Sequence, residues 1–318
     1  FFHDNRVYII TIFSVLSIFM LCQMISSSSP FGVYATTRDD GISQYYTGFV
    51  SFIRSIKNGT FGYSTSYDAG DFQDNYRYDI QNLFTFPYLF LISTIVSEDS
   101  YMLLFTIYYV IILLLSAVAF IYYLTKRHFL NYDKHDKRLI IYALCYTLSS
   151  YTAVFFQYYA GFHLLTFLPL IILGMERLIY DKKPVLYISL LTYLMIINAY
   201  STFLLSEFLI LYFFIQSFKD IKDFISKGIR FAAASLLSAL LSAFNLIPFF
   251  AMTRVSPYLE TDNRAPSLAR FYTSFISQIA EYHTGNPIKA ITSNDAQTAS
   301  YAGLIVLFIL PIYFLLKD

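Results

Sequence analysis

The fold class follows from YMLLFTIYYVIILLLSAVAFIYYL, residues 101–124, an apolar run that contains no charged side chain. As an α-helix it would extend for about 36 Å, which exceeds the roughly 30 Å hydrocarbon core of a bilayer. Other runs that are long enough, or nearly long enough, to cross are residues 7–25, 139–159, 162–179, 184–198, 203–218, 229–250 and 299–316. The sequence therefore predicts an all-α, multi-pass membrane protein with about eight transmembrane helices.

The composition of the chain agrees with a membrane protein. Hydrophobic residues make up 57% of the 318 residues and charged residues 14%, whereas an average globular chain has about 25% charged residues. The net charge of +1 gives no support for nucleic-acid binding, so we expect the lipid bilayer as a partner and no nucleic acid. Cys22 and Cys145 lie in apolar runs without metal-ligand spacing, and we assign no metal ligands. Because the sequence begins Phe1-Phe2 rather than with Met, we expect a fragment of a longer chain.

The topology depends on a shorter apolar run, residues 83–96, which contains Pro87. At 1.5 Å per residue this run reaches only about 20 Å, so we predict an interfacial or re-entrant helix that does not cross. Most of the 22 lysines and arginines then fall on one side together with both termini, as the positive-inside rule expects for the cytoplasm. The loops 26–100 and 252–298 lie outside, and residues 1–318 form a single domain.

An acidic pair, Asp39 and Asp40, lies in the loop that follows the first apolar run of membrane length. A carboxylate near the membrane plane can be partly desolvated, which raises its basicity toward that of a useful general base. The alternative is a solvated turn, because Asp and Gly are ordinary turn residues. We predict a catalytic role for this pair.

A cation at headgroup depth is the second feature. Arg254 comes shortly after the apolar run 229–250, where its guanidinium could clamp a lipid phosphate through two hydrogen bonds. The alternative is a snorkelling interfacial cation. Arg77 is a weaker candidate of the same kind.

Polar residues within the apolar runs gather toward the outer half of the bundle. His163, Asn198 and Glu207 share this depth, and we predict that they line a cavity facing the outer loops. For each residue singly, hydrogen bonding between helices is the alternative. Glu176 and Arg177, at an inner helix end, are predicted to form a local ion pair.

Several stretches resemble the YfhO family of bacterial membrane proteins. They are residues 40–46 (DGISQYY), Gly70-Asp71, 168–178 (LPLIILGMERL), 198–200 (NAY) and 301–304 (YAGL). The resemblance implies a GT-C-type glycosyltransferase bundle with an essential Asp in its first outer loop and a polyprenyl-phosphate-linked sugar as donor. It also implies a cell-wall polymer such as lipoteichoic acid as acceptor, at the outer face of the bacterial plasma membrane. Gln44, Tyr45 and Asp71 lie in these stretches and join the predicted substrate cavity.

The chemistry of such a transfer suits the candidate residues. A lipid phosphate leaves as a stable anion, so the site needs a base for the acceptor hydroxyl and a cation for the phosphate. We predict Asp40 as the base and Arg254 as the cation. No cofactor is assigned, and a divalent cation at Asp39 stays open. The alternative function is a non-enzymatic transporter or lipid flippase, with Glu207 and His163 along its path, although the repeated, broken helices typical of transporters are not evident.

Overall fold

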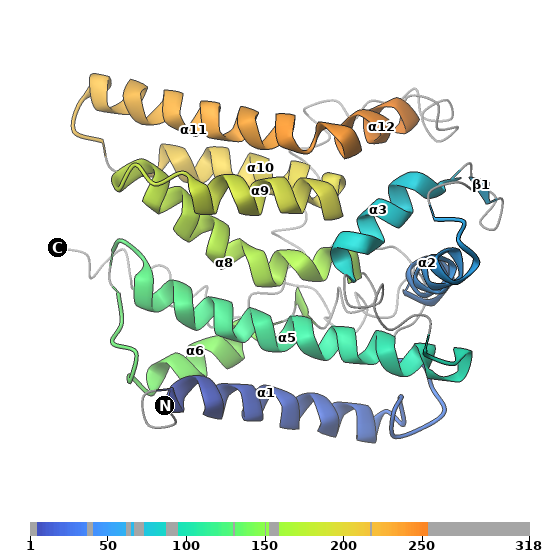
Figure 1. Cartoon of the computed structure of the whole chain (residues 1–318). Coiled ribbons are helices and arrows are strands. Elements are labelled where there is room, and N and C mark those ends of the chain that lie inside the picture. The colour runs from blue at the N-terminus through green and yellow to red at the C-terminus, as the bar shows by residue number, and fades with distance from the viewer. Residues whose placement is uncertain are drawn as a thin grey trace, which may run out of the picture.

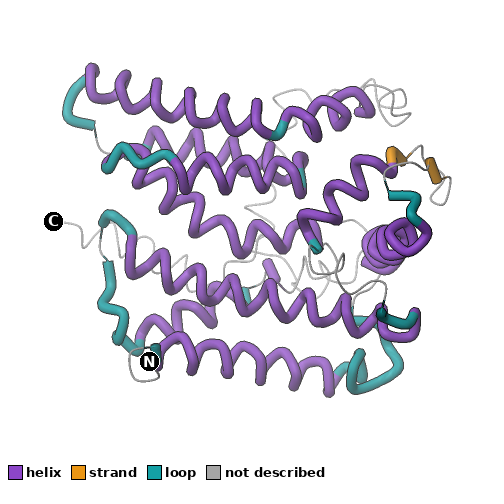
Figure 2. The backbone as a smooth tube through the Cα atoms, viewed as in Figure 1, coloured by secondary structure: helices purple, strands orange, loops and turns teal. Residues whose placement is uncertain are grey.

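The computed structural model describes residues 5–36, 41–61, 65–66, 73–86, 95–129, 131–149, 151–152, 159–216 and 218–253. These residues are mainly helical (Figure 2), and the only strands among them are a short antiparallel pair, β1 (Thr65–Ser66) and β2 (Gln73–Asp74). The helices are α1 (Arg6–Ile25), η1 (Gly41–Tyr46, a π-helical turn), α2 (Thr47–Asn58), α3 (Asn75–Thr85), η2 (Glu98–Ser100, a 3-10 turn), α5 (Tyr101–Lys126), α6 (Arg138–Thr147), α8 (Tyr159–Tyr180), α9 (Val185–Ile197), α10 (Ala199–Phe214), α11 (Ile221–Leu241) and α12 (Ala243–Thr253).

The long helices run side by side and alternate in direction (Figure 1). The start of α1 and the loops that follow α5, α8 and α10 gather at one end of the bundle, which we call the basic end because these loops are rich in Lys and Arg. The loop after α1 together with η1, α2 and α3 lies at the opposite end, which we call the cap end (Figure 1). There α2 crosses the direction of the long helices rather than following it.

Within the described residues, four helices are long and apolar enough to cross a bilayer: α1, α5 with η2, α8 and α11. The helices α6, α9 and α10 are apolar but shorter. Each predicted run before residue 254 thus contains a helix, and the all-α, multi-pass class is confirmed. The predicted run 299–316 lies outside the described residues. So do residues 87–94 of the predicted interfacial helix, and the described residues 83–85 belong to α3.

Two predicted spans have different ends in the structure. The run 139–159 begins as α6 but leaves the helix after Thr147, whose carbonyl accepts a hydrogen bond from the Thr152 hydroxyl at 2.5 Å. The run 229–250 is divided at Ser242 into α11 and α12, and the Ser242 hydroxyl donates to the carbonyl of Ser238 at 2.9 Å. In both places Ser and Thr side chains bond the backbone locally and compete with a continuous helix. The predicted runs are therefore not single continuous helices: α6 ends at Thr147, and α11 begins earlier than predicted, at Ile221, and ends at Leu241.

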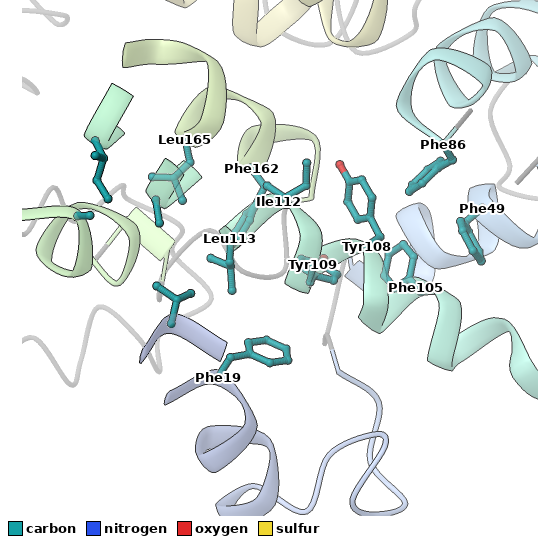
Figure 3. Packing of buried hydrophobic residues seen from close by; sticks show 14 of the residues in the cluster. Phe19, Phe49, Phe86, Phe105, Tyr108, Tyr109, Ile112, Leu113, Phe162 and Leu165 are labelled. Atoms are coloured by element: carbon teal, nitrogen blue, oxygen red, sulfur yellow. The ribbon is translucent and has the colours of Figure 1, made fainter. Parts of the chain in front are cut away.

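The core consists of two hydrophobic clusters that share α8. The first joins α1, α2, α5, α6 and the beginning of α8 (Figure 3). The second joins the rest of α8 with α9, α10 and α11. A Cβ atom on Gly174 of α8 would lie 2.9 Å from the backbone nitrogen of Tyr187, so this glycine permits the close approach of α9. Helix α8 is therefore the shared wall of the bundle.

Pro169 interrupts the hydrogen-bonding of α8 at the boundary between the two clusters. Proline has no N–H, so the carbonyl four residues earlier, that of Leu165, loses its helical donor. The hydroxyl of Tyr146 on α6 donates to this carbonyl at 2.6 Å. The Tyr146 ring stacks on Phe120 of α5, with ring centroids 4.2 Å apart. A neighbouring helix thus supplies the donor that the proline removes, as low-dielectric surroundings require.

Candidate functional site

A buried polar pair lies between α5 and α8 on the cap side of the core. The hydroxyl of Tyr108 and Nε2 of His163 are 2.5 Å apart, and both side chains are only 2% exposed. Each group would be costly to bury alone, because an unpaired polar group in an apolar environment loses its hydration without compensation. The pair therefore fixes the relative rotation of the two helices.

Aromatic rings surround this pair. The Phe86 ring meets Tyr108 edge-on at 4.5 Å between centroids, and the Phe167 ring stacks with His163 at 6.4 Å. Figure 3 shows Tyr108 between Phe86 and Phe162. On the neighbouring helix α9, the hydroxyl of Tyr193 donates to the carbonyl of Phe84 at 2.9 Å. The end of α3 is thus held next to the polar pair by two contacts, one to Tyr108 of α5 and one to Tyr193 of α9.

The stretch that follows the acidic pair is anchored on the same aromatic cluster. Tyr46, the last residue of η1, meets Phe105 of α5 edge-on at 5.5 Å. Phe49 of α2 contacts both Phe105 at 5.2 Å and Phe86 at 5.1 Å, and it is fully buried. Asp40 is covalently bonded to Gly41, the first residue of η1. The chain immediately after Asp39 and Asp40 is therefore fixed to the core at the cap end.

Surface contacts hold α2 against the start of α5. Arg54 bonds the Glu98 carboxylate through two nitrogens, each at 3.3 Å, and Lys57 Nζ donates to the carbonyl of Val96 at 2.7 Å. The hydrogen bonding to Glu98 raises the pKa of the Arg54 guanidinium, which stays charged throughout the working pH range. Both partners of this ion pair are exposed, so it contributes about 0–1 kcal/mol. It orients α2 more than it stabilises the fold.

The sequence-predicted site residues occupy different environments. Tyr45 is half-buried and packs on the first core cluster, whereas His163 is buried in the pair just described. The side-chain oxygen of Asn198 accepts from the Ser201 backbone N–H at 2.9 Å and caps α10, and Glu207 is exposed on α10. For Gln44 in η1 and Arg77 in α3 the structure describes the backbone alone, and Asp39, Asp40, Asp71 and Arg254 lie outside the described residues.

Two features escaped the sequence analysis. Tyr108 lies inside the apolar run 101–124, and its hydroxyl was the available signal, since a hydroxyl at that depth needs a partner. The predicted ion pair between Glu176 and Arg177 is wrong. The buried Glu176 carboxylate instead accepts from the backbone N–H of His128 at 2.8 Å and from the hydroxyl of Tyr212 at 2.9 Å. Glu176 therefore ties the loop after α5 to α10 at the basic end.

Metal binding is not supported by the part of the chain that the structure describes, where no group of three or more His, Cys, Asp or Glu side chains could hold an ion. The acids that would hold a divalent cation at the cap end, Asp39 and Asp40, lie outside those ranges. The divalent cation therefore stays an open prediction.

Membrane-length helices in alternating directions, with one end covered by short helices, define a multi-pass helical membrane protein. The chain belongs to the YfhO family: the family model described as "Bacterial membrane protein YfhO" matches residues 11–318. Comparison with curated proteins and with solved structures finds no match. The family match covers nearly the whole chain and confirms the resemblance seen in the sequence.

Proposed function

We propose that this chain is a GT-C-type membrane glycosyltransferase that moves a sugar from a polyprenyl-phosphate carrier to a cell-wall polymer such as lipoteichoic acid. The observation that carries the proposal is the attachment of η1 and α2 to the buried aromatic cluster at the cap end. It ties the peptide that follows Asp39 and Asp40 to a rigid part of the bundle, as a catalytic carboxylate requires. The family assignment over residues 11–318 supports it.

The proposed reaction needs one base and one cation. Asp40 accepts the proton of the acceptor hydroxyl while that oxygen bonds the anomeric carbon of the sugar. The bond between the anomeric carbon and the phosphate oxygen breaks, and polyprenyl phosphate leaves as an anion held by Arg254, with Arg77 as the weaker candidate. Asp39 orients the acceptor or holds a divalent cation. The leaving phosphate requires no general acid, since it is stable as an anion.

The described residues of the cap end have positioning roles in this proposal. The pair of Tyr108 and His163 supports the end of α3 from below, and Phe86 lies against Tyr108. We propose that Tyr45, next to the anchored Tyr46, contributes to the predicted substrate cavity together with Gln44 and Asp71. The basic end faces the cytoplasm, as the positive-inside rule favours, and the cap end then faces the outside, where the acceptor polymer lies.

The proposal is tested by sugar transfer in membranes that contain the full chain. Asp40→Asn keeps the shape of the side chain and removes its basicity, so transfer should fall by about 10²–10⁴. Arg254→Ala should weaken use of the lipid-linked donor by about one to two orders of magnitude. The matched control is Asp99→Asn, since Asp99 is an exposed acid in η2 at the same end. Its activity should remain normal.

The outcomes separate the alternatives. Loss of transfer in Asp39→Asn but not in Asp40→Asn would move the base by one residue. Full transfer in both variants would remove the transferase assignment. Lipid or solute movement without sugar transfer would instead support the transporter or flippase class.

A further inference from the structure

A surface groove of about 440 Å³ lies at the basic end, remote from the proposed catalytic end. Helix α9 supplies one wall, and the end of α8 and the following loop supply the other. The groove is lined by Arg177, Lys183, Val185, Leu186, Ser189 and Leu190. The surface of the groove is almost entirely apolar, so the two basic residues line it mainly with the carbon chains of their side chains, and their charges belong to its rim.

The turn between α8 and α9 joins the backbones of the two basic residues. The backbone N–H groups of Asp181 and Lys183 both donate to the carbonyl of Arg177, at 3.0 and 3.1 Å. Lys182 adopts a left-handed conformation with φ of 59°, which closes this turn. The backbone of Lys183 is thus bonded to that of Arg177, six positions earlier in the chain, and both residues line the groove.

Neither cation is neutralised within the described residues. The ion pairs there join Arg54 to Glu98, Arg138 to Asp136 and Lys227 to Asp223, so none involves Arg177 or Lys183. Arg177 makes one weak bond, from Nη2 to the Tyr122 hydroxyl at 3.5 Å. A guanidinium has five N–H donors, so this contact leaves most of the Arg177 donors for another acceptor.

The position of the groove indicates which anion it fits. Arg177 lies in the last turn of the membrane-length helix α8, at the depth of lipid headgroups. From there the apolar wall continues along α9, an apolar helix within the bundle, and Val185 at its start is 73% exposed. A soluble anion would use the cations but leave this wall unfilled. A phospholipid places its phosphate on the cations and an acyl chain along Val185, Leu186 and Leu190.

We propose that this groove binds one anionic phospholipid at the basic end of the bundle. A zwitterionic headgroup carries a cation of its own, which the two basic side chains would repel. A headgroup with net negative charge has no such cation, so it is favoured. Basic pockets between membrane helices on the cytoplasmic side bind such headgroups for the same reason. The site is independent of the proposed sugar transfer, because it lies at the opposite end of the bundle.

The test is a lipid titration of the purified full chain in detergent, followed by native mass spectrometry. Phosphatidylglycerol should bind more tightly than phosphatidylcholine, since each juxtamembrane cation contributes about fivefold. Arg177→Gln with Lys183→Gln should therefore reduce phosphatidylglycerol affinity by roughly 30-fold. Inorganic phosphate should neither bind measurably nor compete.

Two further variants keep the proposal falsifiable if the double variant folds poorly. Val185→Asp changes an exposed position and places a negative charge in the groove, so it should also abolish the preference for phosphatidylglycerol. Lys137→Gln removes an exposed cation of the same end that does not line the groove, and it should bind like the wild type. Equal binding of the two lipids by the wild type, or a preference that survives in Val185→Asp, would overturn the proposal. Competition by inorganic phosphate would reassign the groove to a soluble anion.

Discussion

Removing the hydroxyl of Tyr146 should destabilise the bundle through a single backbone carbonyl. Tyr146→Phe keeps the ring and its stacking on Phe120, but it removes the donor that bonds the Leu165 carbonyl at 2.6 Å. That carbonyl has no helical donor because Pro169 lies four residues later. Leaving a buried acceptor unsatisfied costs about 1–3 kcal/mol, and hydrogen bonds between membrane helices average about 0.6 and reach about 1.7 kcal/mol. We expect a loss of about 1–2 kcal/mol in unfolding free energy.

The proline provides a direct test of this reasoning. Pro169→Ala restores an N–H that can bond the Leu165 carbonyl within α8. In that background Tyr146→Phe should cost less than about 0.5 kcal/mol, so the two positions should be coupled. Reversible unfolding of all four variants in one detergent measures the coupling. Tyr200→Phe, at an exposed tyrosine of α10, is the control and should be nearly neutral.

Equal costs of Tyr146→Phe in the two backgrounds would refute the link between the hydroxyl and the proline. The hydrogen bond would then contribute through the position of α6 rather than through the interrupted helix. A neutral Tyr146→Phe in the Pro169 background would refute the requirement for a donor altogether.

Three further predictions concern packing, the basic end and topology. Gly174→Ala should cost about 1–3 kcal/mol of unfolding free energy, because the added Cβ overpacks against the α9 backbone. Gly48→Ala, where no atom lies within 4 Å of the added Cβ, is the control and should be neutral or slightly stabilising. Thermal unfolding compares the two variants. Glu176→Ala should leave two donors without their acceptor and cost about 1–3 kcal/mol for each. Limited proteolysis should then cut the loop after α5 faster than in the wild type. An unchanged cleavage rate would contradict the anchoring role of Glu176. Single cysteines at Ser100 and at Asn131, in a background without the native cysteines, should be labelled from opposite sides of the membrane. These residues come just before and just after α5, at opposite ends of the bundle. Labelling of both from one side would contradict this topology.

The contrast between confirmed and corrected expectations has a physical origin. The helix over 101–124 could be predicted because the bilayer selects for apolar length, which is a local property of the sequence. The residues at which α6 ends and at which α11 gives way to α12 could not be predicted, because these breaks depend on which hydroxyl bonds which carbonyl. For Glu176 the nearest charge in sequence, Arg177, was the wrong partner, because adjacent residues on a helix point in different directions.

The order of the amino acids is enough to predict a multi-pass, all-α membrane protein of the YfhO family, and it points to Asp39 and Asp40 as the candidate catalytic acids. The surroundings of the candidate site emerge from the packing of the helices. Tyr108 and His163 are 55 positions apart and meet because α5 packs on α8. Such a contact leaves no periodic pattern in either helix. Apolar composition specifies that a helix is buried in the membrane, whereas the packing of one helix on another specifies which polar groups share their hydrogen bonds.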